Sequence, residues 1–178
     1  AFKGAFHGRT SGAVATTDNK AIRAPFNRTN KVTFIPINDI SLAERELTKG
    51  EYAAVIIEGI QGVAGIMMPD GRFLSDLRRL CDKHTVMLIL DEVQCGCGRT
   101  GRYFAHQYSG IKPDMITAAK GIGNGFPVGA VLISHKIGAV AGMLGTTFGG
   151  NHLACAAALA VLSVIEEEDL MDNAVKIG

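Results

Sequence analysis

A lysine and an aspartate at the ends of apolar segments are the residues of this chain with the clearest chemical potential. Lys120 follows the run 114–119 and opens the glycine-rich turn 120–127, whereas Asp91 follows the apolar run 86–90. An ammonium group at the mouth of a buried strand must be paired or desolvated, and a desolvated amine loses basicity and can form a Schiff base with a carbonyl. The aspartate supplies an anion at the end of a second buried segment.

The surrounding sequence predicts the elements that position these two side chains. We expect strands at 32–37, 52–58, 86–91, 114–119 and 128–134, and helices from a cap at Asp39 or Ser41 to Gly50, and at 73–84, 102–108 and 151–168. Buried strands that alternate with helices predict an α/β fold with a mostly parallel sheet flanked by helices. Ligands of such sheets bind at the carboxyl ends of the strands, where Glu58, Asp91 and Lys120 all fall. An acid and an amine at that edge are what a pyridoxal phosphate site requires.

Composition excludes several other classes of protein. The 18 lysines and arginines nearly balance 17 aspartates and glutamates, which argues against nucleic-acid binding. No apolar run reaches the ~20 residues that cross a bilayer, so we expect no membrane partner. The four cysteines lack the spacing of a zinc site, which predicts no metal and reduced thiols in a cytoplasmic protein (Cys81, Cys95, Cys97 and Cys155).

Five motifs occur in order along the chain: Phe6-His-Gly-Arg-Thr10, Glu58-Gly-Ile-Gln-Gly62, Leu90-Asp-Glu-Val-Gln94 with Gly98-Arg-Thr-Gly101, Ala119-Lys-Gly121 with Gly125-Phe-Pro-Val-Gly129, and Thr147-Phe-Gly-Gly-Asn151. Together they resemble the class III, ornithine-type aminotransferases, which act on acetylornithine, succinylornithine or ornithine. The resemblance implies the large domain of a fold-type-I pyridoxal phosphate enzyme. It also implies that residues 1–178 are a partial domain, incomplete at both ends, without the amino-terminal segment and the carboxyl-terminal small domain.

The resemblance assigns cofactor-binding roles to the first group of residues. Asp91 resembles the carboxylate that keeps the pyridine nitrogen protonated, and Lys120 resembles the lysine that forms the Schiff base and then moves the proton. Phe6 resembles the aromatic residue on one face of the ring, Val93 the apolar residue on the other, and Gln94 a donor to the phenolic oxygen. Plainer alternatives are a helix-capping aspartate, a loop lysine and a core phenylalanine. Strand alternation predicts that Glu92 points away from Asp91.

The resemblance assigns the remaining roles less directly. Glu58 resembles an acid that holds groups beside the cofactor, and Thr147 the hydroxyl that reaches the cofactor phosphate of a neighbouring subunit. Arg9 resembles the arginine that grips the substrate carboxylate, and Thr146 a substrate contact. A surface ion pair and a generic turn are the alternatives for Arg9 and for the two threonines.

The implied activity is transfer of an amino group from N-acetylornithine, N-succinylornithine or ornithine to 2-oxoglutarate, in arginine biosynthesis and in a homodimer. Alternatives are an ornithine- or GABA-type aminotransferase, an aminomutase of the same fold, or a non-catalytic truncated module. Gly59 stands where the family usually has proline, and Val63 stands where many members have a second glutamate. Since the phosphate-binding turn of the family has no counterpart here, we expect the isolated chain to bind cofactor weakly.

Overall fold

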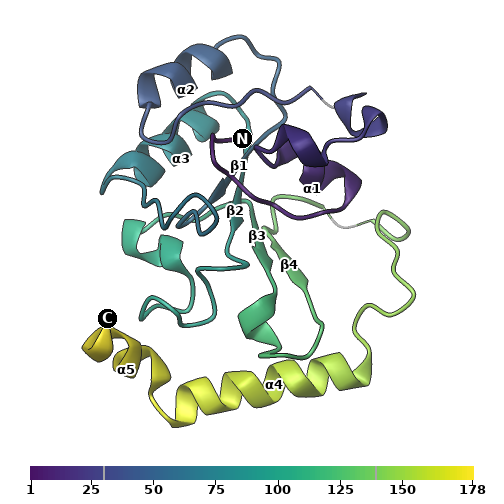
Figure 1. The fold of residues 1–178 in the computed structure, drawn as a ribbon, viewed down its shortest axis with the longest axis vertical. Helices are drawn as coiled ribbons and strands as arrows, with labels where there is room; N and C mark the ends of the chain where they lie inside the picture. Colours follow the sequence, from purple (N-terminus) through teal and green to yellow (C-terminus); the bar gives the residue numbers. More distant parts are fainter. Residues whose placement is uncertain (30, 139) are drawn as a thin grey trace.

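The computed structural model describes residues 1–29, 31–138 and 140–178. A four-stranded sheet lies at its centre (Figure 1). The strands are β1 (Ala54–Glu58), β2 (Met87–Asp91), β3 (Met115–Ala118) and β4 (Ala130–Ile133), in the order β1-β2-β3-β4. The pairs β1–β2 and β2–β3 are parallel, whereas β3–β4 is antiparallel. The predicted α/β fold with a mostly parallel sheet is confirmed.

Five α-helices and four short 3-10 helices surround this sheet among the described residues. The α-helices are α1 (Ser11–Thr16), α2 (Ile40–Leu47), α3 (Phe73–Lys83), α4 (His152–Glu167) and α5 (Leu170–Ile177). The 3-10 helices are η1 (Lys20–Ile22), η2 (Pro25–Thr29), η3 (Ala105–Ser109) and η4 (Lys120–Ile122). The predicted cap of α2 is confirmed, because the Asp39 carboxylate accepts a hydrogen bond of 2.9 Å from the Leu42 amide.

The prediction of a strand at 32–37 is wrong. Only Ile35 pairs there, in an isolated parallel bridge with Phe2. Pro36 has no amide hydrogen for a ladder, and Asn38 takes a positive φ of 67° that turns the chain toward α2. The apolar character of the segment serves the core instead, since Ile35 is buried.

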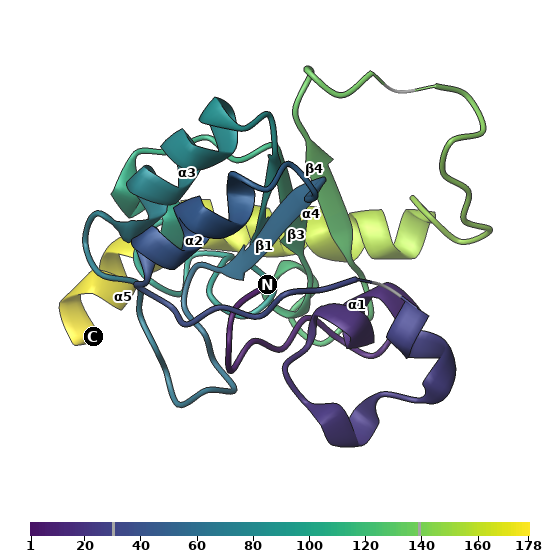
Figure 2. The same ribbon diagram turned by 90° about the horizontal axis from the view of Figure 1, so that it is seen from above.

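The main core lies between the sheet and the helices α2 and α3. Leu77 of α3 packs in one buried cluster with Ile57 of β1 and with Leu88 and Leu90 of β2. Figure 2 shows α2 and α3 on one side of the sheet and α1 on the other. Because side chains alternate along a strand, the residues between these core positions face the side of α1, where the site is built.

Candidate active site

Three polar residues occupy one row across the carboxyl ends of the parallel strands. Glu58 of β1 is paired in register with Asp91 of β2, and Asp91 is paired with Thr117 of β3. Neighbouring strands lie about 4.8 Å apart, so the three side chains are near neighbours. The row lies at the sheet edge where the sequence predicted a ligand site.

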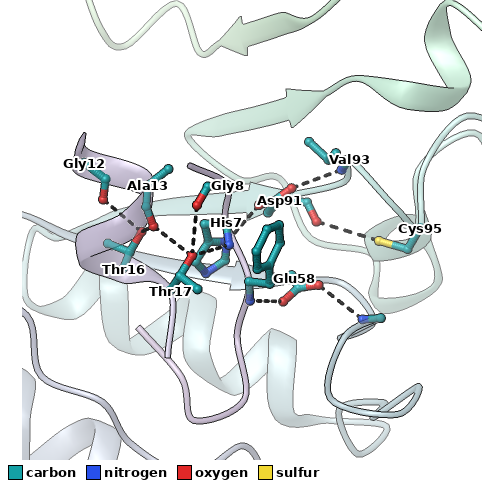
Figure 3. Close-up of polar contacts among 12 residues, drawn as sticks. His7, Gly8, Gly12, Ala13, Thr16, Thr17, Glu58, Asp91, Val93 and Cys95 are labelled. Atoms are coloured by element: carbon teal, nitrogen blue, oxygen red, sulfur yellow. Dashed lines mark hydrogen bonds and ion pairs between the residues drawn. The ribbon is translucent and has the colours of Figure 1, made fainter. Parts of the chain in front are cut away.

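Asp91 is buried and held by two hydrogen bonds (Figure 3). One oxygen, Oδ2, lies 2.7 Å from Nδ1 of His7, and the other, Oδ1, accepts a bond of 3.1 Å from the Val93 amide. Only 5% of Asp91 is exposed. Since a carboxylate only accepts hydrogen bonds, the proton of the first contact belongs to Nδ1 of His7. The side chain is therefore fixed in direction and keeps acceptor capacity.

His7 is a site residue that the sequence reasoning missed. Its amide donates a hydrogen bond of 2.9 Å to Oγ1 of Thr17, whose hydroxyl in turn donates to the Ala13 carbonyl in α1. The segment before α1 is thereby tied to the helix, with the imidazole directed at Asp91. The signal was its place in the first motif, between two residues that were assigned roles, Phe6 and Arg9.

Glu58 ties together two segments that flank the row. Its carboxylate accepts 2.9 Å from the amide of Phe6 and 3.2 Å from the amide of Gly62. Burial raises the pKa of Glu58, and the two amide bonds only partly offset that rise. Glu58 thus holds the backbone of Phe6 in place beside Asp91, and its role next to a cofactor stays a prediction.

A cavity of about 620 Å³ runs along the α1 side of the sheet and reaches Asp91 and Thr117 of this row. Its walls near the row are His7, Ile56, Ile89, Asp91, Val93 and Thr117. Within the described part of the chain, His7 Nε2 and Thr117 Oγ1 are buried without a hydrogen-bond partner. Buried polar atoms are rarely left unpaired, so these two mark a place that a polar ligand can occupy.

Lys120 lies at the neighbouring strand end but not in the cavity wall. It opens η4 just after β3, with a positive φ of 49°, and its side chain is exposed. Its ammonium group forms no ion pair or hydrogen bond with the described residues. The structure thus brings Lys120 to the edge of the site, and its approach to Asp91 stays a prediction.

The remaining predicted residues do not all lie near the row. Gln94 packs against Gly62, where a methyl group would lie 2.6 Å from the Gln94 oxygen. Arg9 is exposed just before α1. Thr146 and Thr147 are exposed in the long segment between β4 and α4, which Figure 1 shows arching away from the sheet. The structure does not bring Arg9 or these two threonines into the row.

Comparison with known proteins decides the family. The model of the class III aminotransferases matches residues 1–178. The chain belongs to the class III aminotransferase family. It is 43% identical over 181 residues to an acetylornithine aminotransferase of Methanopyrus kandleri, covering 100% of this chain and 46% of that protein. An acetylornithine aminotransferase of Corynebacterium efficiens is 47% identical over 178 residues, covering 96% and 44%. The chain thus spans about half the length of these relatives.

Solved structures agree with the family and the fold. The ornithine aminotransferase of Toxoplasma gondii matches with a TM-score of 0.88 and 31% identity, covering 96% of this chain and 42% of that one. A second structure of that enzyme, with a TM-score of 0.85, 32% identity and coverage of 96% and 41%, is described as having partial occupancy of pyridoxal phosphate at its active site. The described residues contain no cluster of metal-binding side chains. None of the helices described is long and apolar enough to span a bilayer.

Proposed function

We propose that these residues belong to a pyridoxal phosphate-dependent aminotransferase that moves an amino group from N-acetylornithine to 2-oxoglutarate. The observation that carries the proposal is the buried Asp91 carboxylate, fixed by His7 and facing the cavity. The names of the similar curated proteins favour acetylornithine over ornithine as the amino donor. Arginine biosynthesis is the proposed pathway on the overall likeness to the acylornithine branch of the family.

The residues present fit pyridoxal phosphate. The cofactor needs an anion at its ring nitrogen, and Asp91 offers a buried carboxylate beside the unpaired atoms His7 Nε2 and Thr117 Oγ1. Val93 lines the same cavity as an apolar surface for a flat ring. Phe6 and Gln94 belong to segments next to this cavity. The Phe6 amide bonds to Glu58, and Gln94 packs on Gly62, whose amide also bonds to Glu58.

Each residue then has a task of its own. Bound pyridoxal phosphate supplies an aldehyde that condenses with amines and a ring that accepts an electron pair. Asp91 holds a proton at the ring nitrogen, and His7 keeps the Asp91 carboxylate aimed at it. The Lys120 amine would hold the cofactor and would move the proton at the reacting carbon atoms. Arg9 orients the substrate by its carboxylate.

The finer assignments follow from the same proposal. The enzyme works as a homodimer in the cytoplasm, where Thr147 reaches the cofactor phosphate of the neighbouring subunit and Thr146 contacts substrate. Exposed apolar side chains support a subunit interface near the start of α4, since Phe148 is 79% exposed and Leu153 is 71% exposed. The four free cysteines are in keeping with a reducing compartment.

The test is the visible absorbance of the full-length protein saturated with pyridoxal phosphate. We expect a yellow band that borohydride bleaches and that Lys120→Ala removes, while the control Lys49→Ala, in the exposed turn after α2, keeps it. Absence of the band from the unmutated protein overturns the proposal. Turnover of acetyl-, succinyl- and free ornithine then decides the amino donor, and faster turnover of free ornithine favours the ornithine aminotransferases instead.

A further inference from the structure

Glu92, which follows Asp91 directly, is fully buried, and its carboxylate accepts hydrogen bonds from four donors. Its exposed fraction is 0%. Oε2 accepts 3.0 Å from the Ala105 amide and 3.0 Å from the Cys95 thiol, and Oε1 accepts 2.9 Å from the His106 amide and 2.8 Å from His106 Nδ1. An acid without substrate access that nonetheless fills its acceptor capacity acts on the protein itself.

The charge of Glu92 is retained despite its burial. Burial alone would raise the pKa of Glu92, but the bonds from His106, Cys95 and the two amides outweigh it, and the pKa lies below its usual range. The thiol of Cys95 is no nucleophile, because burial and the adjacent carboxylate both raise its pKa. The cluster therefore holds segments of the chain together and is not a second catalytic centre.

The hydrogen bonds of Glu92 join the two ends of one loop. Glu92 stands at the start of the segment 93–104, and Ala105 and His106 stand directly after it, so the carboxylate joins the two ends. The Gly96 amide also donates to the Glu92 carbonyl. Inside this loop lies Gln94, whose side chain packs on Gly62. Any movement of the loop start relative to β2 moves Gln94 relative to Asp91.

Gly59 has no side chain, which leaves space for the Glu92 and Cys95 side chains. A methyl group at this position would lie 3.1 Å from the Cys95 sulfur and 3.2 Å from Glu92 Oε1. A side chain at position 59 would press on both partners of the Glu92–Cys95 bond.

We propose that Glu92 and His106 form a clamp, defined by Glu92, Cys95, Ala105 and His106, that positions Gln94 for its contact with the cofactor. The inference rests on the proposed function for the cofactor and goes beyond it by adding two positioning residues. Glu92 touches neither cofactor nor substrate, and its effect passes through the loop to Gln94.

The clamp is tested first without cofactor, by the rate at which iodoacetamide labels Cys95, resolved from the other three thiols by peptide mass spectrometry. In Glu92→Gln, the new NH2 group cannot accept hydrogen bonds from the donors that the carboxylate oxygen served. In His106→Phe, the Nδ1 donor is lost. Loss of a bond to a charged group opens the loop more often, so we expect labelling to accelerate about tenfold or more in both variants. His106→Phe is the deciding variant, because it keeps the carboxylate, whereas Glu92→Gln also removes a charge that raises the Cys95 pKa. His106→Asn, whose amide can replace Nδ1, is the rescue variant, and Glu44→Gln on the surface of α2 is the control.

The coupling to Gln94 is tested by the dissociation constant of pyridoxal phosphate in a double-mutant cycle. We expect Glu92→Gln to weaken binding about 5- to 10-fold in the unmutated background, the value of one hydrogen bond, and less than about twofold when Gln94 is already alanine. Equal weakening in both backgrounds, or unchanged binding when Cys95 labels fast, overturns the inference. Failure of the unmutated protein to bind cofactor overturns the proposed function instead, while the labelling rates still judge the clamp. Circular dichroism shows which variants fold, and His106→Phe replaces Glu92→Gln if the latter does not.

Discussion

Replacing His7 by phenylalanine tests the element of the site that the sequence did not reveal. The change removes one hydrogen bond, between Nδ1 and Asp91 Oδ2 at 2.7 Å, and it keeps a ring of similar size in a place where the side chain is only 1% exposed. The His7 amide bond to Thr17 belongs to the backbone and is unaffected. The perturbation therefore acts on the Asp91 carboxylate, which is left with the single bond from the Val93 amide.

The expected size follows from the charge and burial of the pair. A hydrogen bond to a charged group contributes about 1.5–3 kcal/mol, and leaving a buried acceptor unpaired has a cost of similar size. Unfolding should thus become easier by about 1.5–3 kcal/mol, which for a urea slope of about 2 kcal/mol per M lowers the midpoint by roughly 1 M. Because 1.4 kcal/mol is a factor of ten, cofactor affinity should fall about tenfold when Asp91 loses its orientation.

Urea unfolding without cofactor and titration with pyridoxal phosphate measure the two effects separately. His135→Phe is the matched control, because it changes an exposed histidine outside the site and should leave both values unchanged. A His7→Phe protein that unfolds at the same urea concentration and binds cofactor equally well would refute the reasoning. It would mean that the 2.7 Å contact does not hold Asp91 in solution.

Two further predictions concern the scaffold. Asp114 bonds both Arg78 of α3 at 2.7 Å and the Leu88 amide at 2.8 Å, so Asp114→Ala should cost about 2–3 kcal/mol in urea unfolding, against at most about 1 for Asp76→Ala, whose partner Arg79 is exposed. Because the folded-state pKa of Glu92 is lowered from 4.5, its stabilisation is present above that pH and is lost as the pH falls through the folded pKa. Unfolding curves of unmutated protein and Glu92→Gln should therefore converge in acid, and a constant gap down to pH 3 would contradict the assignment.

Local patterns in the sequence were sufficient to locate the sheet and the ends of its parallel strands. The runs before Glu58 and Asp91 are rich in valine, isoleucine and leucine, and a strand buried on both faces needs such a run. Alternation along β2 also separated Asp91 from Glu92 correctly, since the two acids bond to different partners. These predictions depend only on residues within one segment.

What the sequence could not supply are contacts between distant segments. His7 meets Asp91 across 84 positions, and Glu92 meets His106 across 14. A histidine in a loop has no local pattern that distinguishes a partner of a buried carboxylate from a surface residue. The failed strand at 32–37 has the opposite cause, because a local apolar pattern was present but Pro36 and the turn at Asn38 prevented the ladder.

Three buried acids lie at the ends of two adjacent strands, and their donors decide which one is available to a ligand. A carboxylate offers about four acceptor positions. Glu92 receives four bonds and has none left, whereas Glu58 and Asp91 each receive two. Of these two, only Asp91 lines the cavity. Asp91 is therefore the acid with both spare capacity and access, which is why a cationic ring nitrogen is expected at Asp91 and not at its neighbours.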